Sequence, residues 1–391
     1  MRFSHLVERI AGEGADAWEI HSEANLARQR GEDVILLSVG DPDLDTPAPV
    51  LERAIERLRA GDTHYTPAAG RSALRAAIAA AHRARTGQRV ELENVIYLSG
   101  TQNALFTASL CLAGPGDEVI ALEPLYPTYP ATIEVTGARM VRARAPAEGG
   151  FRVDLAALEA AITPHTRAIC YASPNNPSGV ILSEAELKRI GELARRHSLW
   201  LIADEVYAGL APAGRVPSLA AQLPEQVVTI GSLSKSHAMP GWRAGWLIGP
   251  RQLVQHVESL VMCMLYGLPG FIQEAAITAL EVAPQAERRI RDLCTARRDF
   301  LFGELKGIKG IRYCSPDAGM FTLLDVRQTG LSGREFAREL YRAERVSLMD
   351  VGAFGKETGG FVRLCFAADE ALLREACLRI RRFVASIKKV A

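Results

Sequence analysis

Residues 199–207 read LWLIADEVY, and this stretch decides the fold class. Five apolar residues in a row are followed at once by Asp204 and Glu205. Such a run is typical of a strand that is buried on both faces and ends at a polar edge. Strands of this kind occur in parallel sheets that are covered by helices, so the stretch favours an α/β fold.

Short apolar runs like this one alternate with helical patterns through most of the chain. This alternation predicts a buried, mostly parallel sheet with helices on its faces. The expected strands are 34–39, 95–98, 118–122, 139–142, 168–172, 200–203, 227–230 and 246–248. The expected helices are 17–31, 48–60, 71–86, a helix from the SGTQN segment to about residue 112, 154–162, 183–197 and 251–265.

The pattern changes after about residue 272. Long, Arg-rich helices are expected at 273–306, 332–345 and 369–388, with few strands between them. We therefore expect a large domain over residues 45–285. The two chain ends, 1–44 and 286–391, are expected to form a smaller α+β domain.

Composition excludes several classes of protein. The 391 residues carry 46 Lys and Arg against 45 Asp and Glu, a net charge of +1, which gives no basic excess to bind nucleic acid. Seven scattered cysteines without a CxxC pair, and histidines without an HExxH pattern, favour a reduced cytoplasmic protein without a metal site. No run of about 20 apolar residues predicts a membrane span, and the first ten residues lack the apolar stretch of a secretory signal.

Five segments at the ends of expected strands carry the polar residues. Common nucleotide and hydrolase motifs (GxGxxG, GxxxxGK[ST], GxSxG) are absent from the sequence. The five segments are HYTPAAG (64–70), SGTQ (99–102), SPNNPSG (173–179), ADEVY (203–207), and SLSK (232–235) with Arg243 eight residues later.

Together these segments supply what pyridoxal phosphate needs. The aldehyde needs a lysine amine, the pyridine nitrogen needs a buried carboxylate, and the phosphate needs an arginine, hydroxyls and a helix N-terminus. Lys235 in its hydroxyl-lined turn, Asp204 at a strand end, and the SGTQ turn match these needs in that order. Taken singly, each has a plainer interpretation: a surface lysine, a helix cap and an N-cap turn.

Other candidates also have plain alternatives. The Asn176-Pro177 pair is typical of a loop, and Tyr126 fits ordinary core packing. Arg363 alternates with apolar neighbours in the run FVRL, which is also typical of an exposed charge on an edge strand.

With these motifs in order, the chain resembles the fold type I pyridoxal-phosphate aminotransferases of class I/II, which include aspartate and aromatic aminotransferases. The strings SPNNPSG, ADEVY and SLSKSHAMPGWRAGW carry the resemblance, with Arg363 near the end, and it covers the chain from about residue 15. It implies a large domain with a mostly parallel seven-stranded sheet between helices, a smaller α+β domain, and a homodimer with shared active sites.

The resemblance also implies residue roles. Lys235 would hold pyridoxal 5'-phosphate as a Schiff base and move the substrate proton in a ping-pong transamination between an L-amino acid and a 2-oxo acid. Asp204 would pair with the pyridinium, Tyr207 and Asn176 would bind the phenolic oxygen, and Tyr126 would cover the ring. The phosphate would be bound by Gly100, Thr101, Gln102, Ser232, Ser234 and Arg243, with Tyr65 from a second subunit. The substrate carboxylate would be bound by Arg363, Asn176 and the backbone at Gly40.

Two departures from the family pattern stand out. Pro240 replaces the Thr that is common before Gly241, which would alter the loop beside the phosphate because proline fixes φ and lacks a donor. Ser178 replaces a common Thr, which we take as neutral.

The strings RIAGEGADAWEIH, SLSKSHAMPGWRAGW and CMLYGLPGFIQEAA are similar to arginine–pyruvate transaminases more than to aspartate enzymes. A guanidinium group would need acidic or aromatic partners, and the candidates are Trp18, Glu19 and Tyr266. For Trp18, packing in the protein core is an equal alternative.

Four other functions stay open to different degrees. An aspartate- or aromatic-type aminotransferase and a C–S lyase of the same fold would use the same cofactor residues. A silent cofactor-binding sensor is disfavoured because no DNA-binding motif accompanies the site. A nicotinamide dehydrogenase would need the missing glycine fingerprint.

Overall fold

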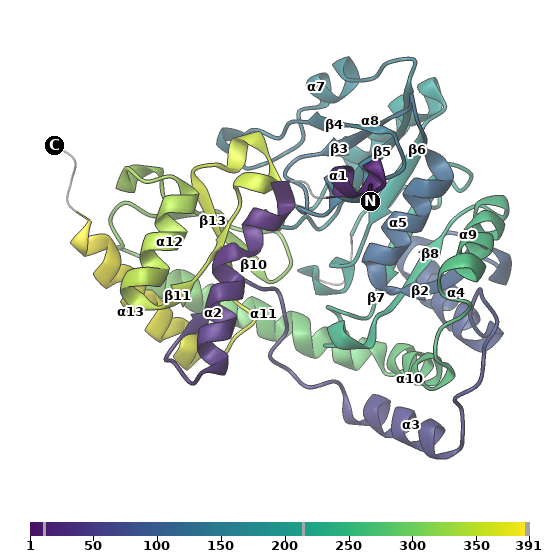
Figure 1. Cartoon of the computed structure of the whole chain (residues 1–391), viewed down its shortest axis with the longest axis horizontal. Coiled ribbons are helices and arrows are strands. Elements are labelled where there is room, and N and C mark those ends of the chain that lie inside the picture. The colour runs from purple at the N-terminus through teal and green to yellow at the C-terminus, as the bar shows by residue number, and fades with distance from the viewer. Residues whose placement is uncertain (11–12, 213–215, 388–391) are drawn as a thin grey trace.

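A seven-stranded sheet forms the core of the larger part of the molecule in the computed structural model, which describes residues 1–10, 13–212 and 216–387 (Figure 1). In spatial order its strands are β2 (Val95–Ser99), β8 (Ala244–Ile248), β7 (Val227–Ser232), β6 (Trp200–Asp204), β5 (Thr166–Ala172), β3 (Glu118–Leu122) and β4 (Arg139–Ala143). All pairs from β7 to β4 are parallel, whereas β8 runs antiparallel to both of its neighbours. The expected seven-stranded, mostly parallel sheet is confirmed.

Both faces of the sheet are covered by helices, as the apolar runs predict. Along β6, Ile202 packs into the core on one face, while Leu201 and Ala203 pack into the core on the other. The covering helices are α4 (Ser72–Thr86), α5 (Gly100–Leu112), α6 (Tyr129–Glu134), α7 (Leu155–Ala160), α8 (Glu184–His197) and α9 (Arg251–Met264). Burial on both faces is why these strands lack the alternation of a half-exposed sheet.

The parallel arrangement places the polar strand ends side by side. Ala172 at the end of β5 pairs with Asp204 at the end of β6, and Asp204 pairs with Ile230 of β7. The motifs SPNNPSG, EVY and LSK follow these ends directly. Ligands of open α/β sheets bind at this edge.

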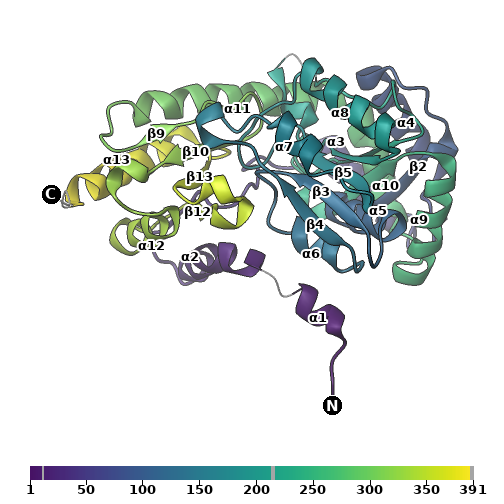
Figure 2. The ribbon, with the colours of Figure 1, turned by 90° about the horizontal axis from the view of Figure 1, so that it is seen from above.

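The long helix expected at 273–306 is two helices, which corrects that prediction. They are α10 (Gly270–Glu281) and α11 (Ala283–Leu305), separated at Val282. Pro284 stands in the first turn of α11. Proline is tolerated there because backbone N–H groups in the first turn make no hydrogen bond within the helix. Figure 2 shows α11 extending from the large sheet to the second group of elements.

The second group contains a four-stranded antiparallel sheet, more strand than the sequence pattern indicates. Its order is β12 (Met349–Asp350), β13 (Phe361–Cys365), β10 (Phe321–Asp325) and β9 (Arg312–Tyr313). Helices α12 (Gly333–Glu344) and α13 (Glu370–Ser386) pack on it through one core that includes Phe336 and Val362. Residue 388, the expected end of the last helix, lies outside the described residues.

The N-terminal part of the chain joins this second group. Strand β1 (Ile35–Leu36) pairs with β11 (Val346–Ser347), and α2 (Glu19–Gln29) packs beside α12. A short 3-10 helix, Glu13–Trp18, precedes α2, so the expected helix at 17–31 is shorter than predicted. Figure 2 shows α1 (His5–Ile10) projecting beyond the body of the molecule.

Within the described ranges, no helix is long and apolar enough to cross a membrane. The division at residues 45 and 285 stays a prediction. Helix α3 (Ala48–Arg59) lies close to that predicted boundary in sequence and packs on α10.

Gly245 allows β8 to pass close to the start of α5. A Cβ atom built there would lie 2.6 Å from the Cα of Gly100, which is backbone and cannot rotate away. At Gly241, a few residues earlier, an added Cβ would meet nothing within 4 Å. The contact between Gly245 and Gly100 therefore sets how closely the strand and the helix turn can approach.

We expect Gly245→Ala to lower the free energy of unfolding by about 1–3 kcal/mol, the usual effect of overpacking a rigid site. Gly241→Ala is the matched control and should leave the thermal midpoint nearly unchanged. Differential scanning calorimetry of both variants checks this. Equal midpoints would show that the turn of α5 moves without strain.

Candidate active site

A cavity of about 210 Å³ lies at the carboxyl ends of β5, β6 and β7. It takes residues from both sheets and from the N-terminal segment. Its aromatic wall is formed by Trp18, Tyr126, Tyr129, Tyr207 and Phe321. Its polar and charged residues are Thr101, Gln102, Asn176, Asp204, Ser234, Lys235, Arg243 and Arg363.

Asp204 is a buried carboxylate at the end of β6, 8% exposed. The hydroxyl of Tyr129 donates a hydrogen bond of 2.6 Å to its Oδ2, and the N–H of Val206 donates to its Oδ1. Burial raises the pKa of Asp204 to about 6, against the lowering effect of those two bonds. No Lys or Arg in the described part of the chain forms an ion pair with it, so the carboxylate is available to a cationic ligand.

Tyr129 is a site residue that the sequence analysis missed. It opens α6, three residues after Tyr126, and its hydroxyl is fully buried against Asp204. The two tyrosines in LYPTY were the only available signal. The contact of Tyr129 with a residue 75 positions away could not be predicted from the spacing in the sequence.

Lys235 follows β7 and points into the cavity. Its Nζ donates a hydrogen bond of 2.5 Å to the carbonyl of Gly40. Burial lowers the pKa of Lys235, while the nearby charge of Asp41 raises it. The lower pKa favours the uncharged amine, the form that attacks an aldehyde.

The turn between β2 and α5 forms a cradle with Arg243. Gly100 has φ +82°, and a Cβ there would lie 2.2 Å from Nη2 of Arg243. The Arg243 guanidinium contacts the carbonyls of Pro240 and Ser99, and the described chain shows no carboxylate paired with it. The Pro240 carbonyl therefore helps to hold the Arg243 guanidinium, and Pro240 also lines the cavity.

Thr101 lies in the same cradle and its hydroxyl is buried without a hydrogen-bond partner. Ser234 lines the cavity, whereas Ser232 lies behind it and accepts the N–H of Ser234. The amide of Gln102 is already engaged by Thr128 and Thr132 of the α6 segment.

Arg363 is 1% exposed and lies on β13, between β10 and β12. Its plain interpretation as an exposed charge on an edge strand is therefore wrong. Nη1 donates to Oδ1 of Asn176 at 2.8 Å, Nη2 donates to the carbonyl of Ser38 at 2.6 Å, and the guanidinium lies 4.1 Å from the ring centre of Phe321. The structure gives it neutral partners only, so this buried cation is available to an anion.

Asn176 connects the two halves of the site. Its Nδ2 donates to the hydroxyl of Tyr207 at 3.3 Å, while its Oδ1 accepts from Arg363. Tyr126 lines the cavity and meets Phe354 edge to face. These contacts bring Asn176, Tyr207, Tyr126 and Arg363 together, as the sequence predicts.

Three predicted residues lie away from this cavity. Tyr65 is 86% exposed and packs against Tyr266, with ring centres 5.2 Å apart. Glu19 forms ion pairs with Arg338 and Arg334 on α12, so its proposed place beside a substrate guanidinium is wrong. Trp18, by contrast, lines the cavity.

The residues fit pyridoxal phosphate. The cradle has a backbone position that only glycine can occupy, an unpartnered hydroxyl and an arginine without a counter-charge. Across the cavity, the buried Asp204 suits a protonated ring nitrogen, and the Lys235 amine suits an aldehyde. Arg363 remains free for a further carboxylate.

Comparison with known proteins agrees with this geometry. The family model for aminotransferase class I and II matches residues 32–380. The arginine–pyruvate transaminase AruH of Pseudomonas aeruginosa is 47% identical, covering 97% of each chain. Aspartate aminotransferase of Bacillus subtilis is 30% identical, covering 93% of this chain and 95% of the relative.

Solved structures show the same architecture. Aspartate aminotransferase from Thermus thermophilus, solved with maleate, superposes with a TM-score of 0.93 at 31% identity, covering 98% of this chain and all of the other. The aromatic aminotransferase of Pyrococcus horikoshii gives 0.86 at 30% identity, covering 92% and 98%. The chain therefore belongs to the class I and II aminotransferases, and it is a transaminase that uses pyridoxal 5'-phosphate.

Proposed function

We propose that this transaminase takes L-arginine as amino donor and pyruvate as acceptor. The observation that carries the proposal is the 47% identity, over 97% of both chains, to the enzyme named arginine–pyruvate transaminase. Two aspartate aminotransferases among the relatives are only 30% and 32% identical to this chain.

The charges of the cavity support this donor over a dicarboxylate. The lining cations are Lys235, Arg243 and Arg363, and each has an assigned task at the cofactor or the α-carboxylate. Among the described lining residues of this chain, no further Lys or Arg remains for the second carboxylate of aspartate. The aromatic face of Trp18 suits a flat guanidinium instead.

A second cavity shares part of its wall with this one. Trp18 and Gln102 line both this cavity and a larger hollow beside α6. The residues that line the hollow include the carboxylate of Glu134 and four cations, Arg9, Arg139, Arg142 and Lys356. Of these cations, Arg139 and Arg142 are paired with Glu118 and Glu123. We propose that the donor side chain extends past Trp18 in this direction.

We propose the following tasks for the cofactor residues. The cradle of Gly100, Thr101, Ser234 and Arg243, with Ser232 behind it, binds the phosphate. Asn176 and Tyr207 bind the phenolic oxygen, and Tyr126 covers the ring. Gln102, whose amide is already engaged, supports the cradle from the α6 side.

When bound, pyridoxal phosphate supplies an aldehyde that takes up the donor's amino group and a ring that accepts the electrons released at Cα. Lys235 would remove the proton from the donor Cα and would then deliver it to the carbon that carried the cofactor aldehyde. Asp204 would hold the proton on the ring nitrogen, because a buried carboxylate and a cation beside it stabilise each other's charged forms. Arg363, Asn176 and the backbone at Gly40 hold the α-carboxylate, and the 2-oxo product leaves before the second substrate binds.

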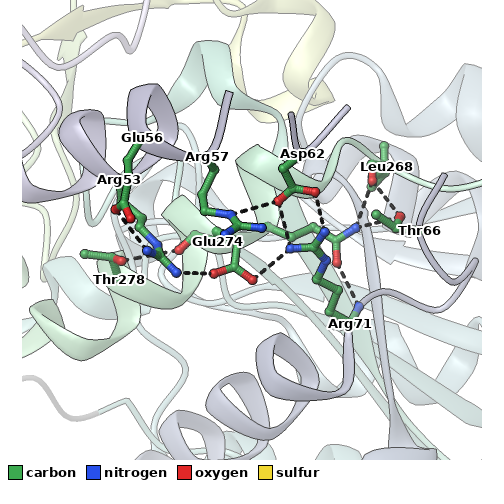
Figure 3. Close-up of polar contacts among 10 residues, drawn as sticks. Arg53, Glu56, Arg57, Asp62, Thr66, Arg71, Leu268, Glu274 and Thr278 are labelled. Carbon is green, nitrogen blue, oxygen red and sulfur yellow. Dashed lines mark hydrogen bonds and ion pairs between the residues drawn. The ribbon is translucent and has the colours of Figure 1, made fainter. Parts of the chain in front are cut away.

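We propose that the enzyme is a homodimer in which Tyr65 completes the phosphate site of the partner subunit. Figure 3 shows part of the polar network beside its loop, in which Arg71 pairs with Asp62 and Glu274. In the same network, Gln273 donates a hydrogen bond to Thr66. This network holds the exposed rings of Tyr65 and Tyr266 in place on one surface. Rigid exposed aromatic residues are typical of interfaces.

We also propose that the enzyme works in the cytoplasm. All seven cysteines are free, and burial raises the pKa of several of them, including Cys170 and Cys294. Protonated, unpaired thiols are typical of a reducing compartment.

An amino-donor panel tests the substrate. Purified holoenzyme is mixed with each amino acid, and the cofactor spectrum and 2-oxo acid release are followed with pyruvate or 2-oxoglutarate as acceptor. We expect L-arginine with pyruvate to give the highest kcat/KM. A higher value for L-aspartate or an aromatic amino acid would overturn the donor assignment, and release of pyruvate and ammonia from cystathionine would identify a C–S lyase.

Tyr129→Phe removes the hydroxyl that stabilises the charged form of Asp204. Its loss raises the pKa of that carboxyl further, so the acid limb of the kcat profile should move to higher pH and kcat should fall about tenfold at neutral pH. Tyr97→Phe is the matched control, because the Tyr97 hydroxyl is buried without a hydrogen-bond partner. An unchanged acid limb in Tyr129→Phe would contradict the proposed role of Asp204.

Trp18→Ala removes the aromatic wall next to the proposed side-chain path. We expect KM for L-arginine to rise about tenfold, from the loss of a cation–π and packing contact, while Trp18→Phe retains most of the affinity. The KM for L-alanine, whose side chain ends before this wall, should stay within a factor of two. Equal changes for both donors would show that Trp18 only supports the fold.

A further inference from the structure

The orientation of Arg363 depends on one backbone carbonyl. Of its two terminal nitrogens, Nη1 is held by the Asn176 side chain and Nη2 by the carbonyl of Ser38, at 2.6 Å. The guanidinium also lies against the ring of Phe321. Its Nε is buried without a hydrogen-bond partner. The Ser38 peptide therefore supplies half of the polar contacts that set the plane of this group.

The Ser38 peptide is itself held by its own side chain. The Ser38 hydroxyl is fully buried and has two polar neighbours. Ser347 Oγ donates to it at 2.9 Å, and Nδ1 of His21 lies 2.9 Å from it on the other side. Because Ser38 Oγ accepts from Ser347, its own proton is directed to His21 Nδ1.

A neutral His21 ring fits this pattern, because its Nδ1 can then accept a hydrogen bond from Ser38. A lone pair on Nδ1 means a neutral ring with its proton on Nε2. Burial and the charges of Arg28 and Arg363 lower the pKa of His21, which favours the neutral form. A protonated ring would donate to Ser38 instead, and would reverse the order of the hydrogen bonds.

His21 also lies next to the substrate cavity. It stands one turn after Trp18, and the two rings meet edge to face with centres 5.7 Å apart. Helix α2 therefore brings a cavity-wall residue and the partner of Ser38 to the same place. The hydrogen bond between Arg363 and the Ser38 carbonyl joins residues that are 325 positions apart in the sequence.

We propose that His21 is a positioning residue for the substrate α-carboxylate. It holds the Ser38 hydroxyl, which fixes the Ser38 carbonyl, and this carbonyl orients the Arg363 guanidinium. The inference rests on the proposed role of Arg363 as the carboxylate-binding residue. It assigns to α2 a function in the binding of every amino acid and 2-oxo acid, apart from any contact with their side chains.

The test compares substrates with and without the carboxylate. Single-turnover reactions of the holoenzyme are measured with L-arginine and with agmatine, which is the same molecule without its carboxylate. If the amino-donor panel identifies a different donor, the same comparison is made with that donor and the amine formed by its decarboxylation. His21→Leu removes the hydrogen-bonding ring, whereas His21→Asn keeps a polar atom near the position of Nδ1. His256→Leu, on the exposed face of α9, is the control.

We expect His21→Leu to raise the apparent Kd for L-arginine roughly threefold to tenfold, the effect of about one hydrogen bond, with agmatine unchanged. His21→Asn should restore most of the affinity, and His256→Leu should resemble the wild type. A second readout is the Kd of 5-guanidinopentanoate, which carries the carboxylate and has no amino group to react. Titration calorimetry should show the same loss.

Equal loss for L-arginine and agmatine, or no loss for either, would overturn the inference. If His21→Leu does not fold, Ser347→Ala removes the other partner of the same hydroxyl and leaves α2 intact, and it should show the same selectivity for the carboxylate. Arg363→Ala separates the two proposals. If that variant binds L-arginine and agmatine as the wild type does, the role of Arg363 itself is wrong.

Discussion

The burial of ionisable groups without a hydrogen-bonded counter-charge from the protein is the constraint on which this structure depends. Asp204, Lys235 and Arg363 lie within one small cavity, and within the described chain each is held by neutral hydrogen-bond partners. Burying an ion without a partner disfavours folding by several kcal/mol. The surrounding fold has to supply that free energy, and a ligand of matching charge returns part of it on binding.

The two sheets meet this constraint in different ways. The parallel strands β5, β6 and β7 are mainly apolar where they cross the core, and Asp204 and Lys235 lie at or just beyond their carboxyl ends, so these groups stand at the edge of the core. Arg363 instead lies within a strand, β13, and reaches the cavity from the side of the second sheet. The cavity lies where the two meet, and the N-terminal segment closes it with Trp18. The arrangement is complementary to a molecule with a cationic ring nitrogen, a phosphate and a carboxylate.

Much of this could be predicted from the sequence, because the strands are short apolar runs and the polar residues follow them directly. The position of Lys235, Asp204, Asn176 and the SGTQ turn follows from that local order. Tyr129, Ser38 and His21 could not be found in this way. Their roles arise from contacts between segments far apart in the chain, and each residue has an ordinary local setting. Glu19 is the opposite case. Its position in the sequence suggested a place in the site, but in the structure it forms ion pairs with Arg334 and Arg338 of α12.

Labelling with borohydride tests the central claim most directly, because it traps a covalent bond to the cofactor wherever the bond is. The purified protein is incubated with pyridoxal 5'-phosphate, reduced, digested and mapped by mass spectrometry. The present account predicts a single labelled peptide, modified at Lys235, and the visible absorbance of a lysine-bound cofactor before reduction. A colourless protein, or a label on another lysine with Lys235 unmodified, would contradict it.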